Sequence, residues 1–264
     1  MREAFARWFE GCLGASLDLA RDDAVPVIAC ERDAPPLWAV NMGGRTLVTV
    51  RPDWLDAVRT VVERLTFEEL FSLFGAVELS RVTLREGWGV WGPAWYYAAD
   101  AAAFLGRADA RVARLSGEEV GQIDHDLFWH CPPDPQGVFF GVYEAGRLAA
   151  LAEVHRNEGE AWEIGVDVAP EAKGSGLGRA VVGTAGRFIL EHRRLVMATT
   201  APWNVPSART MRSLGMRHVL SDLRALPGPF QVPPQMLGSP LPGAELRQYY
   251  PTWAMNRDIR PRDG

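Results

Sequence analysis

The sequence predicts an α+β protein in two parts, a smaller α+β domain at residues 1–110 and a larger domain at residues 111–264. Three observations lead to this prediction. A chain of 264 residues is long enough for one or two domains with complete cores. Residues 138–155 contain two apolar runs around a short polar turn, which is typical of a β-hairpin. Residues 163–189 read as a strand, a glycine-rich turn and a helix.

Composition narrows the class of protein. The chain is 47% hydrophobic and 23% charged, which is ordinary for a globular protein. Its net charge of −5 and its dispersed arginines argue against nucleic-acid binding. No apolar run approaches the length of a membrane helix, and the first residues lack the apolar centre of a signal peptide. Cys12, Cys30 and Cys131 form no C-x-x-C pair, so we expect a cytoplasmic protein without disulfides or a metal site.

In residues 1–110, hydrophobic periodicity and turn residues predict alternating helices and strands. Pro52 fits the first position of a helix, and the sequence from Thr66 to Glu69 fits a capping box. The expected helices cover 2–20, 52–65 and 66–75, and the expected strands cover 25–30, 37–50 with a turn at 41–44, and 78–84.

An aromatic run follows at residues 87–97. Large, rigid rings can line a ligand site, but tryptophan is more often a core residue. We therefore favour packing in the core of the first domain or at the domain interface, and keep a ligand site as the alternative.

Residues 111–264 predict three strands, then a helix, a strand, a helix and a strand. A proline-rich and glycine-rich loop follows at 227–243, and a last strand is expected at 247–255. The earlier expected strands cover 112–115, 138–143, 148–155, 163–168, 194–200 and 216–220, and a helix is expected at 117–129.

The stretch Glu163–Gly178 is the most informative part of the sequence. A strand ends at Pro170, and the alternating Gly174, Gly176 and Gly178 allow a tight turn with exposed backbone N–H groups. An apolar stripe then predicts a helix whose N-terminus lies on this turn. The helix dipole and the charges of Lys173 and Arg179 favour an anion there. We predict a diphosphate cradle, with a purely structural turn as the alternative.

A second motif makes the first more specific. The spacing of the glycines fits neither the dinucleotide fingerprint nor the phosphate-binding loop. Instead, the form K-x-x-G-x-G resembles the acetyl-CoA signature of the GNAT superfamily of N-acetyltransferases, with Lys173 in place of the usual Gln or Arg. The run from Asn204 to Met216 resembles the second signature of that family. The resemblance covers about residues 108–264 and implies a mixed central β-sheet flanked by helices.

The resemblance also implies acetyl-CoA as a co-substrate, without a metal. In the family, backbone groups at the end of the fourth strand hold the thioester and the pantetheine arm, and glycine-turn N–H groups hold the pyrophosphate. The strand positions here are Val166, Asp167 and Val168, and Asn204 and Ser207 would contact the CoA. The cradle positions are Lys173, Gly174, Ser175, Gly176, Leu177, Gly178 and Arg179.

Glu163 is the expected catalytic base, because many members of the family have an acidic residue at this strand position that acts through water. Strand alternation places Glu163, Gly165 and Asp167 on one face, opposite Trp162 and its neighbours. The alternative is that Glu163 forms a structural ion pair or faces solvent. Glu153 and His155, on the preceding strand, are weaker candidates for the base.

The sequence departs from the family pattern at the general acid. The family often has a tyrosine seven residues after the asparagine, but Met211 stands there and cannot donate a proton. Tyr249 or Tyr250 could supply the proton, or the thiolate could leave unprotonated at neutral pH. Loss of activity is the third alternative.

The leading hypothesis is an N-acetyltransferase in which a primary amine attacks the acetyl-CoA thioester directly. The acceptor would be a small molecule or a protein N-terminus, and neither nucleic acid nor a membrane is an expected partner. The alternatives are a non-catalytic acyl-CoA-binding module with a regulatory or interaction role, and an enzyme for longer acyl chains. The oligomeric state stays open, with a homodimer as one option.

Overall fold

The structure is a computed structural model that describes residues 1–31, 35–156 and 159–231. The expected strand at 247–255, most of the expected loop at 227–243, Tyr249 and Tyr250 lie outside these residues.

The first half contains the following elements: α1 (Arg2–Leu13), η1 (Leu17–Leu19), β1 (Val27–Ala29), β2 (Leu37–Met42), β3 (Arg45–Val50), η2 (Pro52–Trp54), α2 (Leu55–Val62), α3 (Phe67–Leu70), α4 (Leu73–Thr83), η3 (Leu84–Glu86) and β4 (Trp88–Ala99).

The second half follows the predicted order of strands and helices. Its elements are β5 (Ala113–Arg114), α5 (Gly117–Val120), β6 (Val138–Glu144), β7 (Arg147–His155), β8 (Ala161–Val168), η4 (Pro170–Ala172), α6 (Leu177–Glu191), β9 (Leu195–Thr200), α7 (Val205–Ser213) and β10 (Arg217–Pro227).

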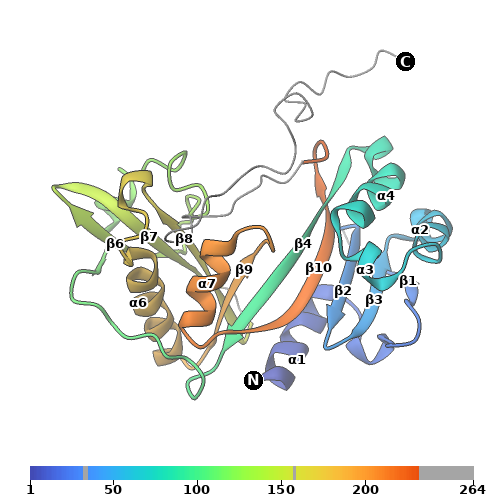
Figure 1. Ribbon diagram of the computed structural model, residues 1–264, viewed down its shortest axis with the longest axis horizontal. Helices are drawn as coiled ribbons and strands as arrows, with labels where there is room; N and C mark the ends of the chain where they lie inside the picture. The colour runs from blue at the N-terminus through green and yellow to red at the C-terminus, as the bar shows by residue number, and fades with distance from the viewer. Residues whose placement is uncertain (32–34, 157–158, 232–264) are drawn as a thin grey trace, which may run out of the picture.

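All the described strands form one sheet in the order β1-β3-β2-β10-β4-β9-β8-β7-β6-β5. Two pairs, β1 with β3 and β8 with β9, are parallel, and the others are antiparallel. This is the predicted α+β class with a mixed sheet flanked by helices. The sheet runs across both halves of the molecule, as Figure 1 shows.

Strand β4 lies between β9 and β10, although it belongs to the first 110 residues. Strand β10 in turn pairs with β2 of the first region. Three strand pairs, β4–β9, β4–β10 and β2–β10, therefore cross the predicted boundary at residue 110. The division into domains at 1–110 and 111–264 stays a prediction.

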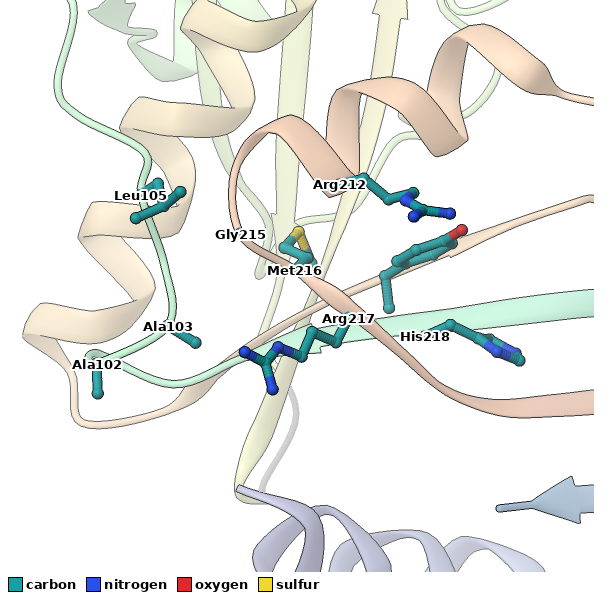
Figure 2. A pocket seen from close by; sticks show the side chains of 9 residues that line it. Ala102, Ala103, Leu105, Arg212, Gly215, Met216, Arg217 and His218 are labelled. Atoms are coloured by element: carbon teal, nitrogen blue, oxygen red, sulfur yellow. The ribbon is translucent and has the colours of Figure 1, made fainter. Parts of the chain in front are cut away.

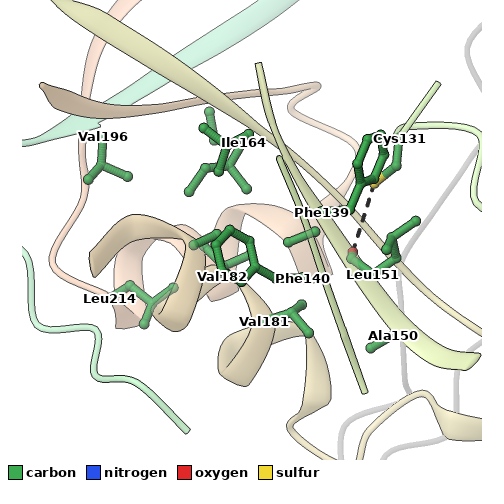
Figure 3. Close-up of a cluster of buried hydrophobic side chains, with 14 of the residues drawn as sticks. Cys131, Phe139, Phe140, Ala150, Leu151, Ile164, Val181, Val182, Val196 and Leu214 are labelled. Atoms are coloured by element: carbon green, nitrogen blue, oxygen red, sulfur yellow. Dashed lines mark hydrogen bonds between the residues drawn. The ribbon is translucent and has the colours of Figure 1, made fainter. Parts of the chain in front are cut away.

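Two apolar layers enclose the sheet. On one face, α6 and α7 pack on the second half, and Figure 3 shows part of this cluster, including Val181, Val182 and Ile164. Helices α2 and α4 pack on the strands of the first half. On the opposite face, Phe5 and Phe9 of α1 contact Tyr96, at ring-centroid distances of 6.3 and 5.7 Å. This face also carries the polar groups described below.

The aromatic run at 87–97 is strand β4, and its Tyr96 and Tyr97 are buried. Tyr96 packs in the cluster around α1, and Tyr97 packs in the cluster around α6 and α7. The favoured interpretation, that this run packs the interior where the two regions meet, agrees with these positions.

The strand expected at 78–84 is wrong, because residues 78–83 belong to α4 and Leu84 begins η3. The β-branched Val82 and Thr83 favoured a strand. However, Ser72 caps a helix through its hydroxyl, and Ala76, Leu79 and Thr83 are buried at helical spacing.

Two expected helices are shorter than predicted. The helix at 2–20 ends at Leu13, because Gly14 turns into the left-handed region with φ 67°. The helix at 117–129 is limited to α5, which has the capping box formed by Ser116 and Glu119. Further along, the Asp124 carboxylate accepts bonds from the backbone N–H groups of Asp126 and Leu127. Such local bonds compete with a helix.

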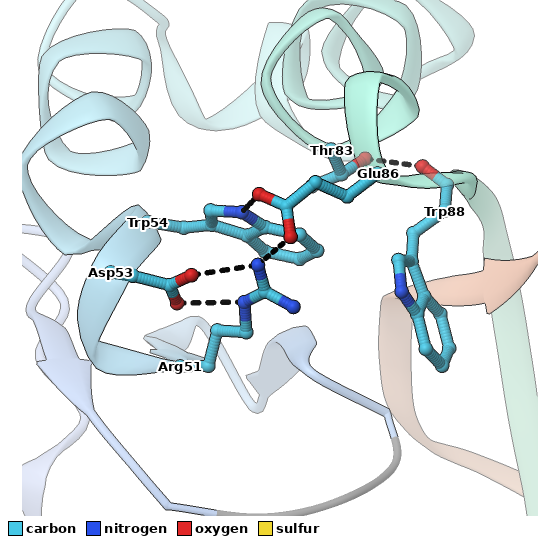
Figure 4. A network of polar contacts seen from close by, with 6 residues as sticks. All are labelled: Arg51, Asp53, Trp54, Thr83, Glu86 and Trp88. Carbon is cyan, nitrogen blue, oxygen red and sulfur yellow. Dashed lines mark hydrogen bonds and ion pairs between the residues drawn. The ribbon is translucent and has the colours of Figure 1, made fainter.

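A polar network lies in the first region, just after the end of α4. The Arg51 guanidinium bonds to Asp53 and Glu86, and the Trp54 indole donates to Glu86 at 2.7 Å (Figure 4). This network joins η2, just before α2, to η3, just after α4. Within the described residues, no helix combines the length and the apolar character that crossing a bilayer requires.

Candidate active site

The candidate site begins where β8 and β9 diverge. These parallel strands pair at Ala161–Leu195, Trp162–Val196 and Glu163–Met197, and the pairing stops there. Strand β8 nevertheless continues to Val168, and β9 continues to Thr200 beside β4. The last residues of β8 therefore lack a strand partner on their β9 side. The predicted positions Val166, Asp167 and Val168 lie on this diverging segment and are half-buried.

The glycine turn follows the diverging end of β8. Gly174 and Gly176 have φ values of 84° and 81°, and a Cβ at either position would meet no atom within 4 Å. Gly176 is the N-cap of α6 and provides no side-chain cap for the first N–H groups of the helix. Lys173 and Arg179 are exposed beside it. The turn therefore offers open space, backbone donors and positive charge, which suit a diphosphate.

Asn204 and Ser207 lie at the start of α7, directly after β9. The Asn204 side chain caps this helix by accepting a bond from the Ser207 backbone N–H at 3.3 Å. Toward the other end of α7, Met211 is only 1% exposed within the cluster around α6. Met211 is thus a packing residue, and we find no proton donor at that position.

Glu163 lies on the sheet face opposite α6. Its neighbour Trp162 faces α6, with a ring-centroid distance of 6.3 Å to Phe188. Glu163 instead accepts a hydrogen bond of 2.6 Å from the hydroxyl of Thr199 on β9. This bond bridges the two strands immediately beyond the point where their pairing ends. Glu163 therefore forms no ion pair among the described residues, and its carboxylate is held at the base of the gap between the strands.

A buried polar cluster continues from Glu163 across the sheet. Thr199 is the register partner of Tyr96, whose hydroxyl donates to Asp222 at 3.2 Å. The Trp38 indole also donates to Asp222, at 2.6 Å. Asp222 is fully buried, and this burial raises its pKa, although the nearby Arg224 opposes the shift. No local motif in the sequence marks this cluster, because its members come from β2, β4 and β10.

Asp167 has a structural role in addition to its predicted position. Its carboxylate accepts bonds from the backbone N–H of His130, at 2.7 Å, and lies 2.6 Å from the Nδ1 atom of His130. These bonds hold the segment before β6 against β8. At Gly165, a Cβ would lie 2.1 Å from the carbonyl oxygen of His130. Only glycine allows this close approach of the His130 backbone to β8.

The weaker base candidates lie on β7, beside Glu163. His155 is the register partner of Glu163, and Glu153 is the partner of Gly165. Glu153 is fully buried, and this burial, together with the charge of Asp134, raises its pKa to about 8. Glu153 therefore cannot contact an acceptor in this conformation.

A separate pocket of about 620 Å³ lies on the α7 face of the sheet (Figure 2). Arg212 and Gly215, at the C-terminal end of α7, line it together with Arg217 and His218 of β10. Asn204 is at the opposite end of that helix. None of the predicted site residues lines this pocket, so it is distinct from the candidate site.

Comparison with known proteins agrees with this geometry. Residues 107–216 match the model of the acetyltransferase (GNAT) family. These residues contain β5–β9, α6 and α7, so the chain carries a GNAT domain, preceded by an additional region. Members of this family are generally acyltransferases that use acetyl-CoA and an acceptor. No curated protein matches the chain.

Three solved structures that are similar to the chain are described as GNAT-family or GCN5-related proteins. A protein assigned to the GNAT family from Novosphingobium aromaticivorans is 23% identical, with 54% of this chain and 68% of that chain covered, at a TM-score of 0.47. A GCN5-related N-acetyltransferase from Kribbella flavida is 18% identical, with 58% and 64% covered, at 0.43. A GNAT acetyltransferase from Colwellia psychrerythraea is 13% identical, with 67% and 75% covered, at 0.44.

Proposed function

We propose that the protein is an N-acetyltransferase that moves the acetyl group of acetyl-CoA to a primary amine. The observation that carries this proposal is the divergence of β8 from β9 beside the glycine turn of α6. In this arrangement the backbone of Val166–Val168 is available to an extended thioester arm. The N–H groups of Gly174–Arg179 and the charge of Lys173 are available to its diphosphate.

Glu163 acts as the general base in this proposal. An ammonium group must lose a proton before its nitrogen can attack a thioester. Glu163 would accept that proton, directly or through a water molecule, while the bond from Thr199 fixes its orientation. Backbone N–H groups at the end of β8 would stabilise the negative charge that develops on the thioester oxygen.

The leaving group needs no tyrosine in this mechanism. Thiols have pKa values near 8.5, so a thiolate can leave at neutral pH without a general acid. This is consistent with the burial of Met211, which occupies the position of the usual tyrosine. Asn204 and Ser207, at the start of α7, would contact the CoA arm.

The proposal also covers the cellular compartment of the protein, its acceptor and its partners. We place it in the cytoplasm, since Cys12, Cys30 and Cys131 are all free thiols. Its amine acceptor would be a small molecule or a protein N-terminus, and a homodimer is compatible with the proposal. Nucleic acids and membranes are not proposed partners.

Burial of Met211 also favours a second candidate, a non-catalytic module that binds acyl-CoA. Glu163→Gln distinguishes the two, because it keeps the shape of the side chain and removes its basicity. For an enzyme, kcat should fall by roughly 10²–10⁴-fold while acetyl-CoA affinity is kept. Thiol release across a panel of amines and calorimetry with acetyl-CoA measure the two quantities. Glu191→Gln, at the exposed end of α6, is the matched control.

The result has three clear forms. Thiol release with one class of amine supports the transferase if Glu163→Gln abolishes it and Glu191→Gln does not. Tight binding of acetyl-CoA without release for any amine supports the module. Absence of acetyl-CoA binding contradicts both candidates and leaves the glycine turn with a structural role only.

A further inference from the structure

Three side chains with metal-binding atoms meet on the outer part of the sheet, beside the candidate site. Glu153 and His155 are two residues apart on β7 and lie on the same face. Asp134 approaches them from the segment before β6. The Nδ1 atom of His155 is 3.3 Å from Oδ2 of Asp134 and 3.4 Å from Oε1 of Glu153. One ligand atom from each of the three side chains lies within 4.8 Å of the others.

Glu153 is the unusual member of this group. Its side chain has no exposed area, yet neither carboxylate oxygen has a hydrogen-bond partner. Among the described residues, no lysine or arginine forms an ion pair with Glu153 or Asp134. A buried carboxylate without a hydrogen bond is costly, so the site requires either a proton or a positive charge.

The spacing of the ligand atoms fits a metal ion. In a tetrahedral zinc site with bonds of about 2.0–2.1 Å, neighbouring ligand atoms are about 3.3–3.4 Å apart. The two distances measured from the His155 nitrogen have these values. Two carboxylates and a neutral imidazole would also balance the charge of a divalent cation. We propose that Asp134, Glu153 and His155 bind a divalent transition-metal ion, with Zn²⁺ as the best match.

The surrounding backbone positions these ligands. The Oδ1 atom of Asp134 accepts a bond of 2.8 Å from the Gln136 backbone N–H, which leaves Oδ2 directed toward His155. At Gly137, a Cβ would lie 2.8 Å from Oε1 of Glu153, so glycine makes room for that carboxylate. The Arg156 side chain donates to the Gln136 carbonyl at 2.7 Å and fixes the same turn.

The site also has access for an ion and for a fourth ligand. The side chains of His155 and Asp134 are 35% and 25% exposed, whereas that of Glu153 is closed to solvent. A metal would enter on the side of the two exposed ligands, and water would complete its coordination. Since His155 pairs in register with Glu163, the ion would lie next to the candidate base without being part of the acetyl-transfer proposal.

Calorimetric titration of the full chain with ZnCl₂, after treatment with a chelator, tests this inference. The wild-type protein should bind one equivalent of Zn²⁺. His155→Gln and Asp134→Asn should each weaken binding by at least about 100-fold, because each removes a ligand. Asp134→Asn keeps an oxygen for the bond from Gln136, so it preserves the turn. His192→Gln is the matched control, because His192 is exposed on α6 and bonds to the Phe188 carbonyl.

Melting curves with and without Zn²⁺ provide a second measurement. Zn²⁺ should raise the Tm of the wild type and of His192→Gln, and leave Glu153→Gln unchanged. Circular dichroism confirms that each variant is folded. The proposal is overturned if the wild type binds no Zn²⁺, because a proton on Glu153 then suffices. It is also overturned if His155→Gln and Asp134→Asn bind Zn²⁺ as the wild type does.

Discussion

Strand β8 and the turn that follows it both depend on glycine, but for opposite reasons. At Gly165 in the strand, a Cβ would lie 2.1 Å from the His130 carbonyl oxygen. At Gly174 and Gly176 in the turn, a Cβ would meet no atom within 4 Å. The His130 backbone therefore fills the space beside Gly165, whereas the space beside Gly174 and Gly176 is empty. Close packing and open space follow one another within about a dozen residues, and we therefore expect a structural role for Gly165 and a ligand-binding role for Gly174 and Gly176.

The largest effect is expected from Gly165→Ala. The added Cβ cannot fit against the His130 backbone, so the segment before β6 must move away from β8. We expect a loss of about 3 kcal/mol in the free energy of unfolding, measured by urea denaturation. Gly11→Ala is the control, because a Cβ there meets nothing in α1 and should be neutral or stabilising. Equal stability of Gly165→Ala and the wild type would show that Gly165 is not required for close packing, and the contrast with the glycine turn would fail.

Gly176→Asp should affect binding rather than folding. It places a carboxylate where the phosphates are expected, and we predict at least about a 100-fold loss of acetyl-CoA affinity, or about 2.7 kcal/mol. Gly176→Asn is the matched control, because it has the same shape and tolerates the left-handed backbone without the charge. Calorimetry measures both variants. If Gly176→Asp binds acetyl-CoA as tightly as Gly176→Asn, the cradle is not an anion site.

Asp167→Asn tests whether the bonds to His130 hold the segment before β6 against β8. The variant weakens two short contacts to His130, at 2.7 and 2.6 Å, and should reduce the free energy of unfolding by about 1.5–3 kcal/mol. Hydrogen exchange should report faster opening of the backbone around His130. Asp126→Asn, on the exposed part of the same segment, should change neither quantity. Unchanged exchange at His130 in Asp167→Asn would contradict the role of these bonds.

The smallest effect, counted per pH unit, concerns Glu153, which faces Gly165 across the β7–β8 pair. Burial and the charge of Asp134 raise its pKa to about 8 from 4.5. The folded protein thus keeps a proton that the unfolded chain has lost. In the presence of a chelator, the free energy of unfolding should therefore fall as the pH rises from about 4.5 to 8, by at most about 1.4 kcal/mol per pH unit.

Glu153→Gln should remove this pH dependence, because glutamine does not titrate. Urea denaturation at several pH values in this window measures the slope. Glu191→Gln, on the exposed end of α6, should keep the slope of the wild type. A slope in Glu153→Gln equal to that of the wild type would assign the pH dependence to other groups.

The local parts of the fold could be predicted from the sequence. The hairpin of β6 and β7, strand β8, the glycine turn and α6 all follow from nearby residues, and Asn204 caps α7 as its position suggested. Residues 78–84 show the limit of local propensity, because the Ser72 cap and burial of one helix face outweighed two β-branched residues.

Contacts between distant segments could not be predicted. Trp38 and Asp222 are 184 residues apart in sequence, yet their side chains share a hydrogen bond. Asp134, before β6, and His155, at the end of β7, are also linked by a side-chain hydrogen bond. No local pattern marks such pairs, because the packing of the whole sheet brings them together. The position of β4 between β9 and β10 depends on the same long-range pairing.

The placement of β4 has a consequence for how the protein is made. During synthesis this strand leaves the ribosome roughly a hundred residues before β9 and β10, the two strands that flank it in the finished sheet. The first region therefore cannot complete its sheet while the rest of the chain is still being translated. Until then, both edges of an apolar strand need protection from other chains. We expect nascent chains that end near residue 110 to be retained by chaperones and to aggregate when released alone.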